Sequence, residues 1–124
     1  MANTEMALKD AMASIEGAVG VALVDYGSGM ALGTLGGSSS LDLNVAAAAN
    51  TDVVRAKLRA MEMLNLQDTI EDILITLGSQ YHLIRLLTGR SGHGLFLYLV
   101  LDVKRANLAM ARHQLKRIEA DLEV

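Results

Sequence analysis

The stretch LFLYLVL, from Leu95 to Leu101, decides the fold of this chain. It is too short to cross a bilayer, and its unbroken apolar character leaves no face for water. A strand of this kind is buried on both faces, which requires a covering layer on each side of its sheet. The segment therefore predicts a central strand with helices above and below it.

Four other segments have the pattern of strands in the same sheet. Residues 19–24 are apolar on both faces, with Val19, Val21 and Leu23 on one side and small residues on the other, which lets a helix lie close. The Asp and Gly residues of 25–29 are typical of a tight reversal into a Gly-broken strand over 30–35. Further strands are predicted over 70–77 and 81–88, joined by Gly78-Ser79, and the Gly-rich segment 89–94 leads into the LFLYLVL strand.

Three segments have helical periodicity. Thr4 is the predicted cap of a helix with the apolar stripe Leu8, Ala11, Met12 and Ile15, which ends at Gly17. The longest helix is predicted over 41–65, with Asp42 at its N-terminus and Ser38, Ser39 and Ser40 as capping residues. Asn107 is expected to cap the last helix, whose apolar positions are Leu108, Ala111, Leu115, Ile118 and Leu122.

These elements predict an α+β fold with the order αββαβββα. The two most apolar strands belong in the middle, whereas the Gly-broken strand and the strand that carries Glu71 and Asp72 belong at the edges. Hairpin connections then give a five-stranded antiparallel sheet in the order 2-1-5-4-3. The long helix covers one face and the other two helices cover the second, as a three-layer α/β/α domain of residues 1–124.

Composition excludes several classes of function. A net charge of −3 argues against nucleic acid, because phosphate binding requires clustered Lys and Arg. The chain has no Cys, which rules out disulfides and thiolate metal sites and fits a reducing compartment. Glu5 and Asp10 lie in an amphipathic N-terminal pattern unlike that of a signal peptide. We expect a cytoplasmic protein without direct membrane insertion.

The polar residues predict no catalytic site, cofactor or metal. The Gly89–Gly94 segment lacks the Lys-Ser/Thr ending of a phosphate loop, and His82, His93 and His113 have no ligand spacing. Glu71 and Asp72 point to opposite faces of a strand, so they are interpreted as charges on an edge strand. We therefore expect a protein that is not an enzyme and has no small-molecule substrate.

Two arginines leave alternatives open. Arg85 lies among apolar residues of a strand, where its stem either runs along the sheet with the guanidinium at the rim or serves a binding partner. The rim position is the favoured interpretation. Arg90 is one of several exposed candidates for an arginine finger, and nothing in the pattern singles it out.

The sequence resembles the Roadblock family, a group of small dynein light-chain-like and bacterial gliding-regulator-like domains related in fold to profilin. The resemblance covers nearly the whole chain. Its matching features are the pattern Leu8-x-x-x-Met12-x-x-Ile15-x-Gly17-x-x-Gly20 leading into Val21–Asp25, the turn with Gly29, the polar Arg85 and the segment Asn107–Leu115. Each feature is a packing or turn pattern, and none is catalytic.

The resemblance implies a homodimer in which the long helix and the third strand of two copies pair across a two-fold axis. It also implies an adaptor or a regulator that binds a small Ras-like GTPase in signal transduction. The long helix independently has more apolar surface than one sheet face requires, although its Ala residues are also good helix formers. The expected dimer interface is Val53, Val54, Leu58, Met61, Ile73 and Ile75, and the expected partner-binding residues along the polar edge of the helix are Asn50, Arg55, Arg59 and Glu62.

A second class of function remains open. A mixed sheet of this kind also suits a small-molecule-binding sensory module with a pocket between sheet and helix. Such a pocket needs convergent polar groups, and the core segments have almost none. Capture of a Ras-like GTPase from a lysate would support the first function. A metabolite that stabilises the protein against heat would support the sensory module.

Overall fold

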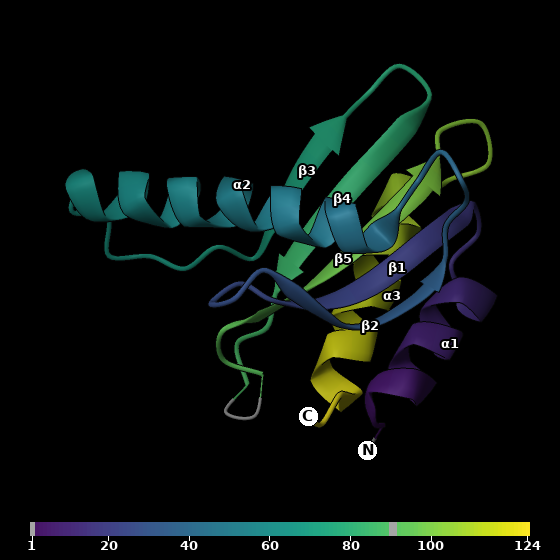
Figure 1. The fold of residues 1–124 in the computed structure, drawn as a ribbon, viewed down its shortest axis with the longest axis horizontal. Helices are drawn as coiled ribbons and strands as arrows, with labels where there is room; N and C mark the ends of the chain where they lie inside the picture. The colour runs from purple at the N-terminus through teal and green to yellow at the C-terminus, as the bar shows by residue number, and fades with distance from the viewer. Residues whose placement is uncertain (1, 90–91) are drawn as a thin grey trace.

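The predicted order of elements is confirmed. The computed structural model describes residues 2–89 and 92–124. The chain runs through α1 (Thr4–Ser14), β1 (Ala18–Asp25), β2 (Met30–Gly36), α2 (Leu43–Met63), β3 (Asp72–Thr76), β4 (Gln80–Leu86), β5 (Leu95–Asp102) and α3 (Leu108–Asp121) (Figure 1). The sheet has the order β2-β1-β5-β4-β3 with antiparallel neighbours, as the sequence predicts.

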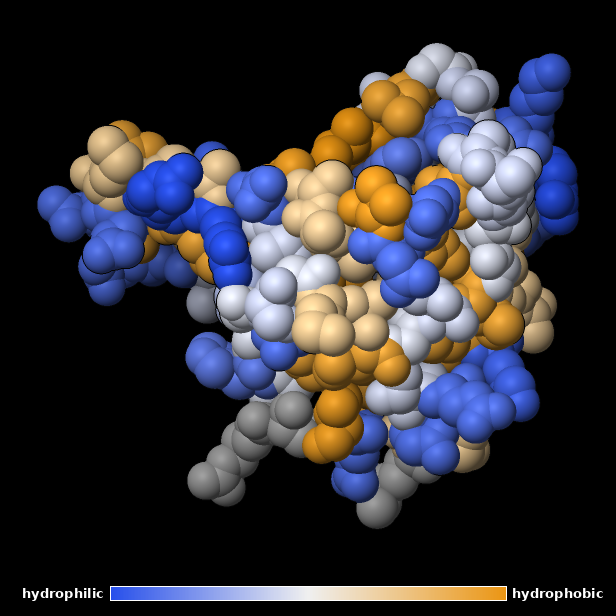
Figure 2. All heavy atoms as spheres, in the orientation of Figure 1, coloured by the Kyte–Doolittle hydropathy of each residue, from blue (hydrophilic) through white to orange (hydrophobic). Residues whose placement is uncertain are grey.

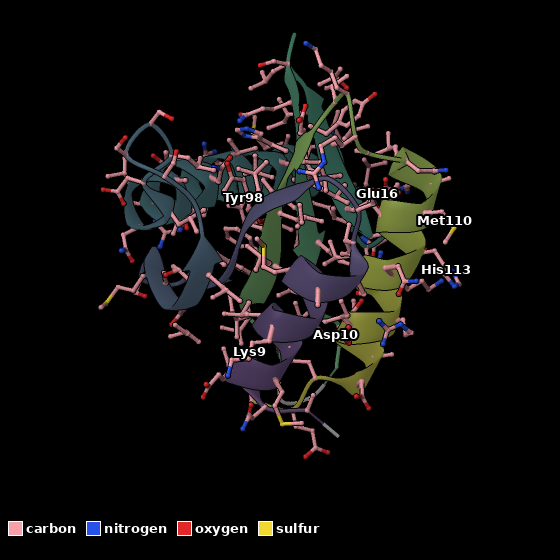
Figure 3. The ribbon with its side chains drawn as sticks, turned by 90° about the vertical axis from the view of Figure 1, so that its right-hand side faces the viewer. Lys9, Asp10, Glu16, Tyr98, Met110 and His113 are labelled. Atoms are coloured by element: carbon pink, nitrogen blue, oxygen red, sulfur yellow. The ribbon has the colours of Figure 1, made fainter. Side chains whose placement is uncertain are left out.

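Two apolar layers enclose the sheet. Helix α2 covers one face, and α1 and α3 lie side by side on the other (Figures 1 and 3). Every residue of the LFLYLVL stretch is buried, which confirms its central position. Leu97 and Leu99 pack with α1 and α3, whereas Phe96 and Tyr98 pack in the layer under α2.

The seam between α1 and α3 is closed by an ion pair. Asp10 lies on the side of α1 next to α3 (Figure 3), where its carboxylate accepts hydrogen bonds of 3.1 and 3.2 Å from the guanidinium of Arg117. The Arg117 guanidinium holds the pKa of Asp10 below its usual value. On the far side of α3, Met110 and His113 point away from the body of the molecule (Figure 3).

At the beginning of β1, the side chains do not lie on the faces of the sheet that the sequence predicts. The pairing of β1 with β5 shifts between Ala18 and Gly20, which marks a β-bulge. Val19 therefore packs on the α2 side, while Val21 packs with α1 and α3, and the prediction that both share one face is wrong. Gly20 and Ala22 lie on the α2 side as predicted, and a Cβ at Gly20 would lie 3.2 Å from the side chain of Leu43, whereas Ala18 packs on the side of α1 and α3.

Two predictions of helix-capping residues are wrong, and in each case the residue that caps the helix is close by in the sequence. The side chain of Asn3, not Thr4, accepts the capping hydrogen bond of α1 from the Met6 amide. At α2, Asp42 accepts from the amides of the first turn as predicted, whereas Ser38 and Ser40 bond to each other in the preceding turn. The Asn107 cap of α3 is confirmed.

The predicted ranges of β3 and β4 are longer than the strands themselves. Residues 70 and 71 precede the strand and are part of the loop that leads to it. β3 is therefore a short edge strand of five residues. Within residues 2–89 and 92–124, no helix combines the length and the apolar character needed to span a bilayer.

Candidate functional site

Helix α2 is longer than the sheet face that it covers. It packs on the sheet through Leu43, Ala47 and Val54, and the half of the helix toward its C-terminus projects past the edge of the sheet where β3 begins (Figure 1). At the projecting end, Met63 is 78% exposed and Leu64 is 67% exposed. The chain then returns to β3 through residues 64–71.

A groove of about 740 Å³ lies between the projecting half of α2, the return segment and β3. Figure 2 shows hydrophobic residues over β3 and at the outer end of α2. The groove has an apolar wall of Val53, Met61, Leu66, Ile70 and Ile73 and a polar rim of Lys57, Asp68, Thr69, Glu71 and Asp72. An apolar floor with a polar rim is the anatomy of a protein–protein interface.

Strand β3 continues this apolar surface to the end of the sheet. It pairs with β4 on one side, and its other edge is the border of the sheet. Ile73 and Ile75 face the α2 side, opposite Ile84 and His82 of β4. Leu74 on the other face of β3 and Leu77 at its end are 39% and 45% exposed. The backbone edge and its side chains are therefore open to another chain.

The structure brings together part of the expected dimer interface. Val53, Met61 and Ile73 line one groove, and Ile75 extends the same face along β3. Leu58 is partly buried against the core, and Val54 is completely buried within the chain. Since Val54 has no exposed surface to lose, it supports the helix from beneath and offers no contact area to a partner.

The expected partner-binding residues divide between two sides of α2. At about 3.6 residues per turn, Arg55, Arg59 and Glu62 form one stripe, whereas Asn50 points toward the sheet on the β3 side. The amide of Asn50 donates to the carbonyl of Ala46 and also bonds to the Tyr98 hydroxyl.

The guanidinium of Arg55 has backbone partners in the β1–β2 turn. It donates hydrogen bonds of 2.8 and 2.5 Å to the carbonyls of Tyr26 and Gly27. The β1–β2 turn therefore holds the guanidinium of Arg55 at this edge of the helix. The side chains of Arg59 and Glu62 are exposed.

A buried ion-pair network fastens α3 to the β3 edge. The guanidinium of Arg85 lies 2.6 Å from a Glu119 carboxylate oxygen and 3.9 Å from Asp72, and all three side chains are only 10–11% exposed. Arg112 of α3 adds hydrogen bonds of 2.8 and 3.2 Å to Asp72, and Thr88 donates to Glu119.

This network corrects two interpretations of the sequence. Arg85 is neither at the rim nor free for a partner, and Asp72 is not a solvated edge charge. The pairing of Arg112 with Asp72 raises the pKa of the arginine. The partners of Arg85 lie 13 residues before it and 34 after it, so no local pattern marks them.

A second polar cluster lies on the α2-side face of the sheet. The Nδ1 atom of His82 is 2.9 Å from the Tyr98 hydroxyl, and its Nε2 atom is 3.0 Å from Oε1 of Gln80. Burial lowers the pKa of His82 below its ordinary value of 6.5. Burial also raises the pKa of Tyr98, while a hydrogen bond from Asn50 acts in the opposite direction.

The described residues contain no cluster of metal ligands. Across 2–89 and 92–124, no three His, Asp or Glu side chains converge as metal ligands. Arg90, the arginine-finger candidate, and Ser91 lie outside the described residues, so the Gly89–Gly94 segment is characterised only in part.

Comparisons with known proteins identify the architecture. No family model matches the sequence, and a comparison with curated proteins finds no match. Among solved structures, the Roadblock/LC7 domain from Streptomyces avermitilis superposes with a TM-score of 0.80 at 10% identity, over 97% of this chain and 94% of that chain. The class that these elements define is thus the Roadblock/LC7 fold.

Particular proteins of that fold are similar over most of the chain. MglB from Myxococcus xanthus matches at 17% identity and a TM-score of 0.73, over 93% of this chain and 77% of that one. MglC from the same organism matches at 21% identity and a TM-score of 0.60, over 94% and 93% of the two chains. A further MglB structure is described as having a tetrameric arrangement. At these sequence identities, the structural similarity establishes the fold of this chain.

Proposed function

We propose that residues 1–124 form a single Roadblock domain that acts as a non-enzymatic, homodimeric regulator or adaptor and binds a small Ras-like GTPase through α2. The observation that carries this proposal is the apolar surface that runs from the projecting half of α2 across the groove to the edge of β3. Monomeric proteins rarely leave a continuous apolar surface of this kind open to water. A partner is therefore required to cover it.

A second copy of the chain fits this surface. In a two-fold dimer the same patch lies on both copies, so the two β3 edges pair and each α2 projects over the other copy's sheet. Val53, Ile73 and Ile75 then provide the apolar contacts, and Met61, which is 9% exposed within the chain, lines the groove beneath them. Edge pairing removes the open backbone of β3, which is otherwise a site of indiscriminate association.

The GTPase is assigned to the stripe of Arg55, Arg59 and Glu62. These side chains lie on the side of α2 away from β3, so dimer formation leaves them accessible. Charges at such a surface set specificity and the rate of association more than the affinity itself. The Ras-like identity of the partner rests on the family resemblance, and the proposed location of the protein is the cytoplasm.

Replacement of Arg59 by Glu tests the partner-binding stripe. We expect binding to a purified Ras-like GTPase, loaded with GDP or a GTP analogue, to weaken at least about tenfold, because a favourable charge becomes a repulsive one. Biolayer interferometry measures the affinity, and the thermal unfolding temperature should stay unchanged because the side chain is exposed.

Lys116→Glu is the matched control for this prediction. Lys116 is an exposed basic residue of α3, on the opposite side of the sheet from α2. Its reversal changes the net charge equally and should leave GTPase binding intact. Equal losses in both variants would indicate a general charge effect, and unchanged binding of Arg59→Glu would remove the stripe from the partner surface.

The sensory alternative requires a ligand in the groove beside α2. The groove has apolar walls and several polar groups, which is the general requirement for such a site. Because the groove lies on the proposed dimer surface, a protein is favoured over a metabolite as its occupant. A thermal-shift screen distinguishes the two functions. A metabolite that stabilises the protein, together with no binding of a GTPase, would support the sensory alternative.

A further inference from the structure

His82 occupies a part of the α2-side face that the chain's own helix leaves uncovered. It stands on β4 between Ile75 of β3 and Val100 of β5. Val100 is completely buried in the layer beneath α2, whereas Ile75 and His82 are only partly buried. The cover over this face therefore ends between β5 and β3.

The hydrogen bonds of His82 suit a neutral ring. Since the amide oxygen of Gln80 only accepts, Nε2 carries the proton and donates to it at 3.0 Å. Nδ1 is then free to accept from the Tyr98 hydroxyl at 2.9 Å. Burial raises the pKa of the same hydroxyl and Asn50 lowers it, which connects the ring to helix α2.

A second proton on this ring would oppose that arrangement. Protonated Nδ1 becomes a donor, so the Tyr98 hydroxyl has to accept from the ring and direct its own hydrogen elsewhere. The half-buried ring of a single chain can meet this demand with water. A ring covered by another protein surface cannot, because charge without solvent or a counterion is costly.

One carboxylate, Asp102, shares the face of His82, and among the described residues no ion pair joins the two side chains. On β5 the same face carries Tyr98 and Asp102, and Asp102, which lies opposite Gln80 in the pairing of β5 with β4, accepts from the Lys104 amide. On β3 this face presents isoleucines, and on α2 Asn50 acts on the Tyr98 hydroxyl that His82 contacts. Burial alone accounts for the lowered pKa of His82.

We propose that His82 makes self-association of this chain sensitive to pH, because the projecting α2 of a second copy covers the surface of Ile75 and His82. This inference rests on the proposed homodimer. The projecting helix extends beyond the β3 edge, and two-fold symmetry brings the equivalent helix of the other copy over β3 and the beginning of β4. Neutral His82 is compatible with that cover, and charged His82 is not.

The sign of the effect follows from linkage. Covering the ring lowers the pKa of His82 further, so the dimer binds fewer protons than two separate chains. The contribution of neutral His82 to dimer affinity is complete above the pKa of His82 in the separate chain, which lies below 6.5, and it falls as the pH decreases through that pKa. Each dimer contains two copies of the His82 ring, which makes the dependence of dimer affinity on pH steeper.

Sedimentation velocity of the full chain at about pH 7.5 and about pH 5.5 tests the proposal. We expect the dissociation constant of the wild-type dimer to rise at least about tenfold at the lower pH. His82→Gln should show less than about a twofold change, and the control His113→Gln should behave as wild type because His113 points away from the body of the molecule on α3. Circular dichroism at both pH values establishes that every variant is folded.

The outcomes separate this inference from the proposed dimer. A wild-type dimer of equal affinity at both pH values overturns the role of His82 and leaves the dimer intact, as does a full pH response in His82→Gln. A monomer at both pH values contradicts the dimer and the inference with it. As a second measurement, NMR titration of His82 should give a higher pKa in the monomeric variant Val53→Glu than in the wild-type dimer, and equal values overturn the proposal.

Discussion

Replacement of Arg85 by Ala is expected to cost about 3–5 kcal/mol of the free energy of unfolding, because it leaves a buried carboxylate without its partner. The change leaves the carboxylate of Glu119 without its cation in a site where the side chain is only 10% exposed. A loss of this size is a large part of the stability of a typical domain, which is about 5–15 kcal/mol. Urea unfolding followed by circular dichroism measures it.

Two control variants identify the cause of that loss. Arg112→Ala removes a guanidinium that is 49% exposed, so we expect a cost of about 1 kcal/mol or less. The double variant Arg85→Met with Glu119→Leu removes both buried charges and should be more stable than Arg85→Ala alone. A cost below about 1 kcal/mol for Arg85→Ala would show that the buried network does not fasten α3 to the sheet.

Replacement of Val53 by Glu is expected to convert the proposed dimer to a monomer. Val53 is 37% exposed within the chain and lines the groove between α2 and β3. In the dimer it becomes buried, and two carboxylates without partners then raise the dissociation constant at least about 100-fold. Glu is a good helix former, so α2 itself should persist. Light scattering on a size-exclusion column measures the mass.

Met30→Glu provides the matched control at the other edge of the sheet. Met30 begins β2 and is 67% exposed, so the substitution introduces the same charge into an apolar position outside the proposed interface. This variant should remain a dimer. Monomer formation by Met30→Glu, or a stable dimer in Val53→Glu, would place the interface elsewhere.

The sequence predicts most of this fold because its strongest signals are local. A fully apolar strand requires two covering layers, and the LFLYLVL stretch confirms that logic in the buried side chains of β5. Asp42 and Asn107 sit at helix N-termini, where their side chains bond to nearby amides. The β-bulge near Val19 is missed because it arises from pairing with β5, which residues 18–20 do not reveal by themselves.

The candidate site is predicted less completely because it depends on contacts between distant segments. Periodicity along α2 identifies apolar positions but does not separate Val54, buried within the chain, from Val53 on the open groove. Arg85 attracts attention as a charge within an apolar strand, yet its partners come from β3 and α3. The return segment, with Leu66 in the groove wall, has no periodic pattern and is found only in the folded chain.

The mass of the wild-type protein in solution tests the central claim most directly. The apolar surface of α2 and β3 predicts self-association at micromolar concentration and neutral pH. Light scattering should therefore give twice the 13.2 kDa of one chain. A mass of 13.2 kDa under the same conditions would contradict the claim that a second copy covers this surface.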